Sequence, residues 1–222
     1  MKRGMSYVLG VALITLPLLA IGGVLWSMEP PPQVLQPEPS NPSNPSNPSS
    51  AATISEPEWW RGAADAIVTI DTFPDFECIA CCETEVVATE AIKWYPKITK
   101  MVYHPFPLSE LGQVIAEALE AAGEQGKFWE LHDKVAQVMP RDVDALKACA
   151  AEVGLDMQKW DEALKSGKFT EKVRLAKEKA IARGVTEATI FVNGKEYHKY
   201  PPDVGDISAM IVEAKDKIMT GG

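Results

Sequence analysis

The chain has 222 residues, of which 46% are hydrophobic and 24% charged, and this is the composition of a globular protein with one ordinary domain and appendages. Its formal net charge of -9 disfavours nucleic acid and anionic lipid as the main partner. Four cysteines are too few for a disulfide-rich scaffold of this size, and three of them crowd into residues 78–82, which indicates chemistry rather than stapling.

The first segment is predicted to be a membrane anchor. Lys2 and Arg3 precede an apolar run from Tyr7 to Trp26 that carries no charge. At about 1.5 Å per residue this run spans roughly the 30 Å hydrocarbon layer, and the positive-inside rule keeps the basic residues cytoplasmic. We therefore expect residues 1–26 to be an uncleaved transmembrane signal anchor, with the C-terminal domain on the extracytoplasmic side of the cell membrane. A cleaved signal peptide is the alternative.

Residues 27–57 are predicted to be a disordered linker, because they are rich in proline and serine and repeat the triplet Ser-Asn-Pro between residues 40 and 48. Proline at every third position favours extended polyproline II backbone at about 3.1 Å per residue. We expect this linker to be an inert spacer that holds the domain away from the membrane.

The folded domain, residues 58–222, is expected to open with a β-α-β unit. Alternating side chains predict a strand at Ile67–Phe73, and a helix follows at Cys81–Tyr95. Pro96 ends that helix, and the β-branched and aromatic residues of Ile98–Phe106 predict a second strand.

A helical block is predicted at about residues 109–183, where the apolar residues recur at helical spacing. The expected helices are Leu111–Ala122, Phe128–Val138, Val143–Val153, Met157–Ser166 and Phe169–Ala182.

Strand signals return after this block. Thr189–Val192 and Lys195–Tyr200 flank Asn193-Gly194, a dipeptide typical of a hairpin turn, and an amphipathic helix follows at Ile207–Ile218. The element order therefore predicts an α/β fold into which a helical module is inserted.

The candidate catalytic centre is Cys78 with Cys81. Cys78 lies after a predicted strand and before a helix, where the unpaired N–H groups of the first helical turn favour a thiolate. Cys81, three residues later, lies on the same helical face and is near enough to form a small-loop disulfide. Half of a zinc site and a purely structural disulfide are the alternatives. The chain has no second Cys-x-x-Cys and no paired histidines, so we expect no metal.

Cys82 is an additional thiol whose role the sequence leaves open. It lies four residues after Cys78, so either Cys81 or Cys82 is close enough to resolve a mixed disulfide. The same Cys-x-x-x-Cys spacing suits a soft-metal chaperone, because thiolates favour Cu(I). A copper chaperone is therefore the main alternative function.

Several further stretches carry a resemblance to a known family. They are Gly62-Ala63-Ala64-Asp65-Ala66-Ile67-Val68, Asp75-Phe76-Glu77-Cys78 with Cys81, Phe106-Pro107-Leu108, Gln125-Gly126-Lys127-Phe128-Trp129 with His132-Asp133, and Phe191-Val192-Asn193-Gly194. Together they resemble the DsbA-like thiol:disulfide oxidoreductases, in the group where a helical domain interrupts a thioredoxin-like fold.

The resemblance implies a division of labour between the two cysteines. Cys78 would exchange with thiols or disulfides of exported proteins, Cys81 would resolve the mixed disulfide, and a membrane redox partner of the quinone-linked type would recharge the pair. It implies no cofactor.

The sequence departs from the family pattern beside the cysteines. Ile79-Ala80 replaces an inner dipeptide that usually begins with proline in the family. Thr72 stands where the family usually has an acidic residue, and Asp71 is expected to point to the other face of the strand. A proton acceptor is therefore missing or relocated.

The expected substrate-binding loop is Glu187, Ala188 and Thr189. Ala188 stands where the family has a cis-proline, and a cis bond before alanine would cost about 2.5 to 4 kcal/mol, so we expect a trans peptide. This departure motivates a third hypothesis, a redox-inactive module that binds exported clients.

The remaining cysteine and the histidines are expected to be structural. Cys149 lies at helical spacing among apolar residues, which predicts a buried and inert thiol. His132 and Asp133 are adjacent on a helix and face different directions, so packing and capping are expected of them. His104 and His198 are not expected to be ligands.

Overall fold

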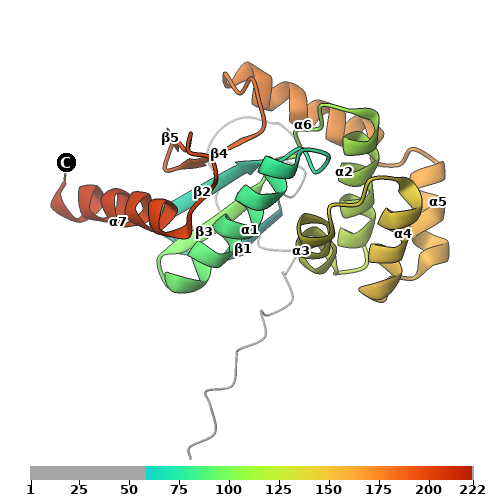
Figure 1. Cartoon of the computed structure of the whole chain (residues 1–222), viewed down its shortest axis with the longest axis horizontal. Coiled ribbons are helices and arrows are strands. Elements are labelled where there is room, and N and C mark those ends of the chain that lie inside the picture. The colour runs from blue at the N-terminus through green and yellow to red at the C-terminus, as the bar shows by residue number, and fades with distance from the viewer. Residues whose placement is uncertain (1–58, 222) are drawn as a thin grey trace, which may run out of the picture. The chain divides into compact units, whose positions relative to one another are not determined.

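The computed structural model describes residues 59–221 (Figure 1). The predicted anchor at residues 1–26 and the predicted linker at 27–57 lie outside this range. Within the described part of the chain, none of the helices combines the length and the apolar character that a membrane crossing requires.

A five-stranded mixed sheet forms the centre of the domain, with the strand order β1-β3-β2-β4-β5. The β2–β3 pair is parallel, and the other neighbouring strands are antiparallel. The strands are β1 (Trp59–Gly62), β2 (Val68–Phe73), β3 (Thr99–Tyr103), β4 (Thr189–Val192) and β5 (Lys195–Glu196).

Strand β1 was not predicted, because its four residues are too few to show an alternating pattern. It pairs antiparallel with β3, where Trp59 lies opposite Tyr103. Gly62 ends the strand at φ +111°, and a Cβ there would lie 2.4 Å from the carbonyl oxygen of Thr99. Only glycine fits this crossing.

Strand β5 is shorter than the predicted Lys195–Tyr200. The turn at Asn193-Gly194 has positive φ at both residues, as its sequence predicts. The N–H of Tyr197 still donates to the carbonyl of Ile190 at 3.0 Å, and the chain then leaves the sheet toward Pro201 and Pro202, which have no N–H groups for a ladder.

Two helices, α1 (Ile79–Trp94) and α7 (Val204–Thr220), pack on one face of the sheet. The apolar core between them includes Val68 and Ile70 of β2 and Ile207 and Ile211 of α7, each with no exposed surface. Ala180 of α6 packs with Phe73 and Phe191 on the opposite face.

The predicted helical block forms the five helices α2 to α6. In Figure 1, α2, α3, α4 and α5 lie together beside the sheet. Their centre is Trp160, which is fully buried and donates from its indole N–H to the carbonyl of Ala118 at 3.1 Å. The helices are α2 (Glu110–Gly123), α3 (Phe128–Val138), α4 (Val143–Glu152), α5 (Met157–Lys165) and α6 (Thr170–Ala182).

Cys149 of α4 belongs to this core and is 2% exposed. Burial raises the pKa of its thiol. The predicted burial of this residue is therefore confirmed.

Candidate active site

The structure joins Cys78 and Cys81 in a disulfide at the beginning of α1, with their Cα atoms 5.2 Å apart. Cys78 is the N-cap of the helix in an extended conformation, and its Sγ accepts the backbone N–H of Cys81 at 3.2 Å. Because this cap satisfies the first turn, α1 begins at Ile79, two residues earlier than predicted. Both cysteines are half-buried.

The loop before Cys78 is fixed from two sides. The backbone N–H of Cys78 donates to the carbonyl of Asp75 at 3.0 Å, and the buried Asp75 carboxylate accepts the N–H of Glu77 at 3.2 Å. Burial raises the pKa of Asp75. From the loop after α3, Arg141 donates to the carbonyl of Glu77 at 2.9 Å. The backbone around the disulfide is thus preorganised.

Cys82 lies in the core rather than at the active site. Its side chain has no exposed surface, and its Sγ donates to the carbonyl of Phe76 at 3.4 Å. Burial, together with the nearby charge of Glu85, raises the pKa of the Cys82 thiol to about 12. A thiolate ligand pair of Cys78 and Cys82 is therefore disfavoured. Residues 59–221 also contain no group of three or more His, Cys, Asp or Glu arranged to hold a metal ion.

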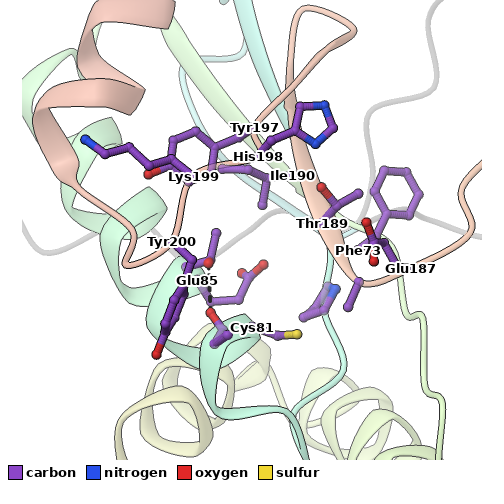
Figure 2. Close-up of a pocket in the computed structure, with 14 residues that line it drawn as sticks. Phe73, Cys81, Glu85, Glu187, Thr189, Ile190, Tyr197, His198, Lys199 and Tyr200 are labelled. Atoms are coloured by element: carbon purple, nitrogen blue, oxygen red, sulfur yellow. Dashed lines mark hydrogen bonds between the residues drawn. The ribbon is translucent and has the colours of Figure 1, made fainter.

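A cleft of about 210 Å³ opens between the first turns of α1 and the segments on either side of the β4–β5 hairpin (Figure 2). Cys81 and Glu85 of α1 line one wall, and the predicted loop of Glu187, Ala188 and Thr189 lines another. Residues 197–200 complete the cleft. The structure therefore brings the predicted loop to the same cleft as Cys81.

The peptide bond between Glu187 and Ala188 is trans, as the missing proline led us to expect. Among the described residues, the cis bond is the one between Tyr200 and Pro201, in the segment that lines the other side of the cleft.

Glu85 is a buried carboxylate beside this centre that the sequence did not single out. It lies one helical turn after Cys81, and its side chain is 1% exposed. Its Oε2 lies 3.1 Å from Nε2 of His132, which has no exposed surface. In Figure 2 the side chains of Glu85 and Cys81 point to the same side of α1, into the cleft.

The packing predicted for His132 is confirmed, but the expectation that His132 and Asp133 face different directions is wrong. The imidazole does pack against aromatic rings, but Nδ1 also lies 3.0 Å from Oδ1 of Asp133. Although adjacent helix positions point apart, the short Asp133 side chain reaches back to the ring. Hydrogen bonds to Asp133 and Glu85 outweigh the lowering effect of burial, so the pKa of His132 is raised.

Arg61 of β1 completes the cluster. Its Nη1 donates to both carboxylate oxygens of Asp133, at 2.9 and 2.8 Å, and its guanidinium lies 4.3 Å from the ring centre of Trp129. Its Nη2 donates to the hydroxyl of Thr89 on α1. Burial favours the neutral form of Asp133, but the hydrogen bond from His132 and the charge of Arg61 outweigh it and lower the pKa of Asp133 to about 2.

The strand position that usually carries an acid is filled by buried Thr72, whose hydroxyl faces the carbonyl of Val102 at 3.5 Å. Asp71 points to the opposite face, as predicted, where its Oδ1 lies 2.9 Å from Nε2 of His104. Within α1, which follows the disulfide, the buried acidic residue is Glu85.

Comparison with known proteins supports this picture. A family model described as thioredoxin matches residues 55–212, more than half of the chain. The fold is similar to that of a thioredoxin-like oxidoreductase from Silicibacter pomeroyi, with a TM-score of 0.63 and 20% identity over 72% of this chain and 92% of that one. It is also similar to alpha-DsbA1 of Wolbachia pipientis, with a TM-score of 0.66 and 17% identity over 74% of this chain and 93% of that one. For oxidised BdbD of Bacillus subtilis the TM-score is 0.60 and the identity 20%, over 70% and 92% of the two chains.

Two curated relatives carry a different name. The chain is 32% identical over 160 residues to the Na(+)/H(+) antiporter NhaA 3 of Salinispora tropica, and 33% identical over 146 residues to NhaA 1 of Salinispora arenicola. The matches cover 69% and 62% of this chain but 24% and 22% of those proteins. The chain spans about a quarter of the length of these relatives, so their ion exchange is not assigned to this chain.

The family match and the formed Cys78–Cys81 disulfide agree with the relationship that the sequence indicates. The chain belongs to the thioredoxin family, and its thioredoxin-like fold, interrupted by a helical domain, is similar to the folds of DsbA-like proteins.

Proposed function

We propose that this protein exchanges thiols and disulfides of exported proteins on the extracytoplasmic side of a membrane, with Cys78 as the nucleophile and Cys81 as the resolving cysteine. The observation that carries the proposal is the Cys78–Cys81 disulfide at the capped beginning of α1. The free N–H groups of the first turn stabilise a thiolate at Cys78 when the bond opens, so Cys78 is the better leaving group and nucleophile.

In the oxidising direction, a thiolate of the client attacks Sγ of Cys78. The Cys78–Cys81 bond breaks, Cys81 leaves with the electron pair, and a mixed disulfide links the client to Cys78. A second client thiolate attacks the client sulfur of this bond and displaces Cys78. Two electrons have then passed from the client, which gains a disulfide, to the cysteine pair, which is reduced. The reverse sequence reduces a client disulfide.

The reduced pair must pass its two electrons on before another oxidising cycle. We expect the acceptor to be a membrane redox protein of the quinone-linked type, because the apolar segment at residues 1–26 would hold the domain at the membrane surface. The linker at residues 27–57 would let the domain reach both its clients and this partner.

The cleft beside Cys81 suits an extended segment of the client. Cys81 lies in one wall, and Glu187, Ala188 and Thr189 lie in another, so a client chain held there would lie beside the disulfide. Tyr200 is 63% exposed at the rim and offers an aromatic surface for an apolar client side chain.

The full chain in detergent, with single-serine variants, provides the test. Cys78→Ser should abolish oxidation of a reduced model client, and Cys81→Ser should accumulate a mixed disulfide visible by non-reducing electrophoresis. Cys149→Ala is the matched control, because it removes a buried thiol far from the centre, and it should exchange like the unmodified protein. Full exchange by Cys78→Ser would refute the assignment of the nucleophile.

The same proteins separate the two other hypotheses. A copper chaperone would bind one Cu(I) through Cys78 and Cys82 and would not need Cys81. Because Cys82 is buried, we expect no Cu(I) binding that requires Cys82. A redox-inactive binding module would hold an unfolded client equally well with either cysteine replaced, and its disulfide would not turn over.

A further inference from the structure

We infer that Glu85 exchanges the proton of Cys81 during disulfide exchange, and that His132, supplied by the inserted helical domain, positions Glu85 and shares its proton. This inference rests on the proposed function and deepens it. It places part of the redox machinery in α3, outside the thioredoxin-like half of the domain.

The first argument is the position of Glu85 relative to Cys81. Residues four apart on a helix are neighbours, with Cβ atoms about 5 to 6 Å apart. Both side chains line the same cleft, and both point into it in Figure 2. His132 contacts Oε2 of Glu85, so Oε1 is the carboxylate oxygen that can accept a proton from the cleft side. The carboxylate is therefore within reach of the Cys81 sulfur, directly or through one water molecule.

The second argument is the number of protons that the cluster can hold. Each nitrogen of His132 faces a carboxylate oxygen, and an ionised carboxylate only accepts hydrogen bonds. Two hydrogen bonds from Arg61 keep Asp133 ionised, so Asp133 accepts a hydrogen bond from Nδ1, which carries a proton. The contact between Nε2 and Glu85 then holds one proton, which lies on the imidazole or on the carboxyl group.

This shared proton gives Glu85 two useful states. With the proton on His132, Glu85 is a carboxylate that can accept a proton from Cys81. With the proton on Glu85, the carboxyl group can donate one. Burial strengthens the coupling, because the low local dielectric makes an unshared charge costly.

The charges that face His132 come from three elements. They are Glu85 of α1, Asp133 of α3 and Arg61 of β1. Four aromatic rings also pack against it, those of Phe76, Tyr103, Phe128 and Trp129, at centroid distances of 5.3, 5.7, 6.2 and 4.9 Å. Of these charged partners, Glu85 is the one that lines the cleft with Cys81, so it links His132 to the cysteines.

The chemical step balances as follows. When a mixed disulfide on Cys78 is resolved, the Glu85 carboxylate takes the proton of the Cys81 thiol. The Cys81 thiolate then attacks Sγ of Cys78, the bond between Cys78 and the client breaks, and the client sulfur leaves with the electron pair. In the oxidising direction, Cys81 leaves Cys78 as a thiolate and receives the proton from Glu85. Glu85 re-equilibrates its proton with solvent through the cleft.

The test measures this resolution step alone. Reduced full-length protein in detergent reacts with one equivalent of a chromogenic aromatic disulfide, which forms a mixed disulfide at Cys78. Stopped-flow absorbance then follows release of the second aromatic thiolate from pH 5 to 10. We compare the unmodified chain with Glu85→Gln, His132→Asn and Glu90→Gln. Glu90 lies exposed on the same helix, so its substitution removes a carboxylate outside the cluster.

Glu85→Gln should slow release about 10²-fold at pH 7, the usual contribution of a positioned general base. Its rate should then rise with pH and approach that of the unmodified chain at the alkaline end of the range, where hydroxide replaces the missing base. His132→Asn should lose about 10-fold and shift the pH profile, and Glu90→Gln should change nothing. A Glu85→Gln profile equal to that of the unmodified chain, or one lowered by the same factor at every pH, would overturn the inference.

The failure of this inference differs from the failure of the proposed function. If the unmodified chain releases no second thiolate, the proposed function fails. If it releases the thiolate and Glu85→Gln does so with the same pH profile, only the role of Glu85 fails. Thermal unfolding of each variant gives the control for folding. A variant that is unfolded at the assay temperature is replaced by Asp133→Asn, for which the same shift of the profile is expected.

Discussion

The two adjacent residues Cys81 and Cys82 have different surroundings. Cys81 lies on the cleft side of α1, joined to Cys78, whereas Cys82 is turned into the core of the helical block. One residue on a helix is about 100° of rotation, and this is enough to separate a redox-active thiol from a structural one. The reactivity of each thiol therefore depends on the side of α1 on which it lies, and not on how near it is to Cys78 in the sequence.

The largest expected effect concerns the labelling of these thiols. In the reduced native protein, Cys78 should react with iodoacetamide at pH 7.5 at least about 10³-fold faster than Cys82. The Cys82 thiol has a pKa of about 12, against about 8.5 for a free cysteine, so few Cys82 side chains are thiolates, and burial blocks access as well. Peptide mass spectrometry over time measures the ratio, and labelling in denaturant should bring all four cysteines to completion. Comparable native rates would contradict the comparison.

A second difference separates the partly buried ion pair of Arg61 and Asp133 from the ion pairs on the surface. Arg61→Met should cost about 2 kcal/mol of unfolding free energy, because it leaves the partly buried Asp133 carboxylate without its cation. Arg174→Met is the matched control. Its pairs with Glu171 and Glu178 are exposed, and their loss should cost less than about 0.5 kcal/mol. Denaturant unfolding of the two variants measures both values, and equal losses would show that the cluster adds no stability.

The pH dependence of stability should report the same cluster. The pKa of Asp133 is about 2 in the folded chain and near 3.8 when unfolded, so its contribution is present above pH 3.8 and is lost as the pH falls toward 2. The carboxylate is 36% exposed, and solvent screening reduces the effect to about 1 kcal/mol. Unfolding between pH 2 and 6 should therefore show a shallower slope in Asp133→Asn. If the unfolding free energies of the two proteins changed in parallel with pH, Asp133 would make no pH-dependent contribution to stability.

His132 should act in the opposite sense. Its pKa is raised in the folded protein, so its stabilisation is present below the unfolded pKa near 6.5 and is lost as the pH rises through the higher folded value. The difference in unfolding free energy between the unmodified chain and His132→Asn should therefore shrink above neutral pH. A difference that grows with pH would mean that the imidazole is buried in its neutral form.

The sequence predicts the region around the disulfide well because its signals are local. The end of a strand, two cysteines three apart and the beginning of a helix are contiguous at residues 68–81, and the structure places them together. The exact beginning of α1 was missed because Cys78 caps it with sulfur, and cysteine is not a usual cap.

The cluster of Glu85, His132, Asp133 and Arg61 was not predictable in the same way. Its members come from α1, α3 and β1, and the pairing depends on how the helical block docks against α1. One signal was present. Glu85 interrupts the buried stripe of α1 formed by Cys82, Ala88 and Ile92, and a carboxylate in an apolar stripe requires a partner. The sequence shows that a partner is needed but not which residue it is.

The smallest expected effect returns to Cys82. Cys82→Ala removes one buried sulfur, so it should cost at most about 1 kcal/mol of stability, and it should change the rate of client oxidation by less than about twofold. Cys81→Ala under the same assay should stop turnover at the mixed disulfide, because the resolving thiol is gone. If Cys82→Ala slowed resolution as much as Cys81→Ala, Cys82 would have to reach Cys78 by a rotation of the first turn of α1. The separation of the two sides of the helix would then hold only in the oxidised protein, where the Cys78–Cys81 bond fixes that turn.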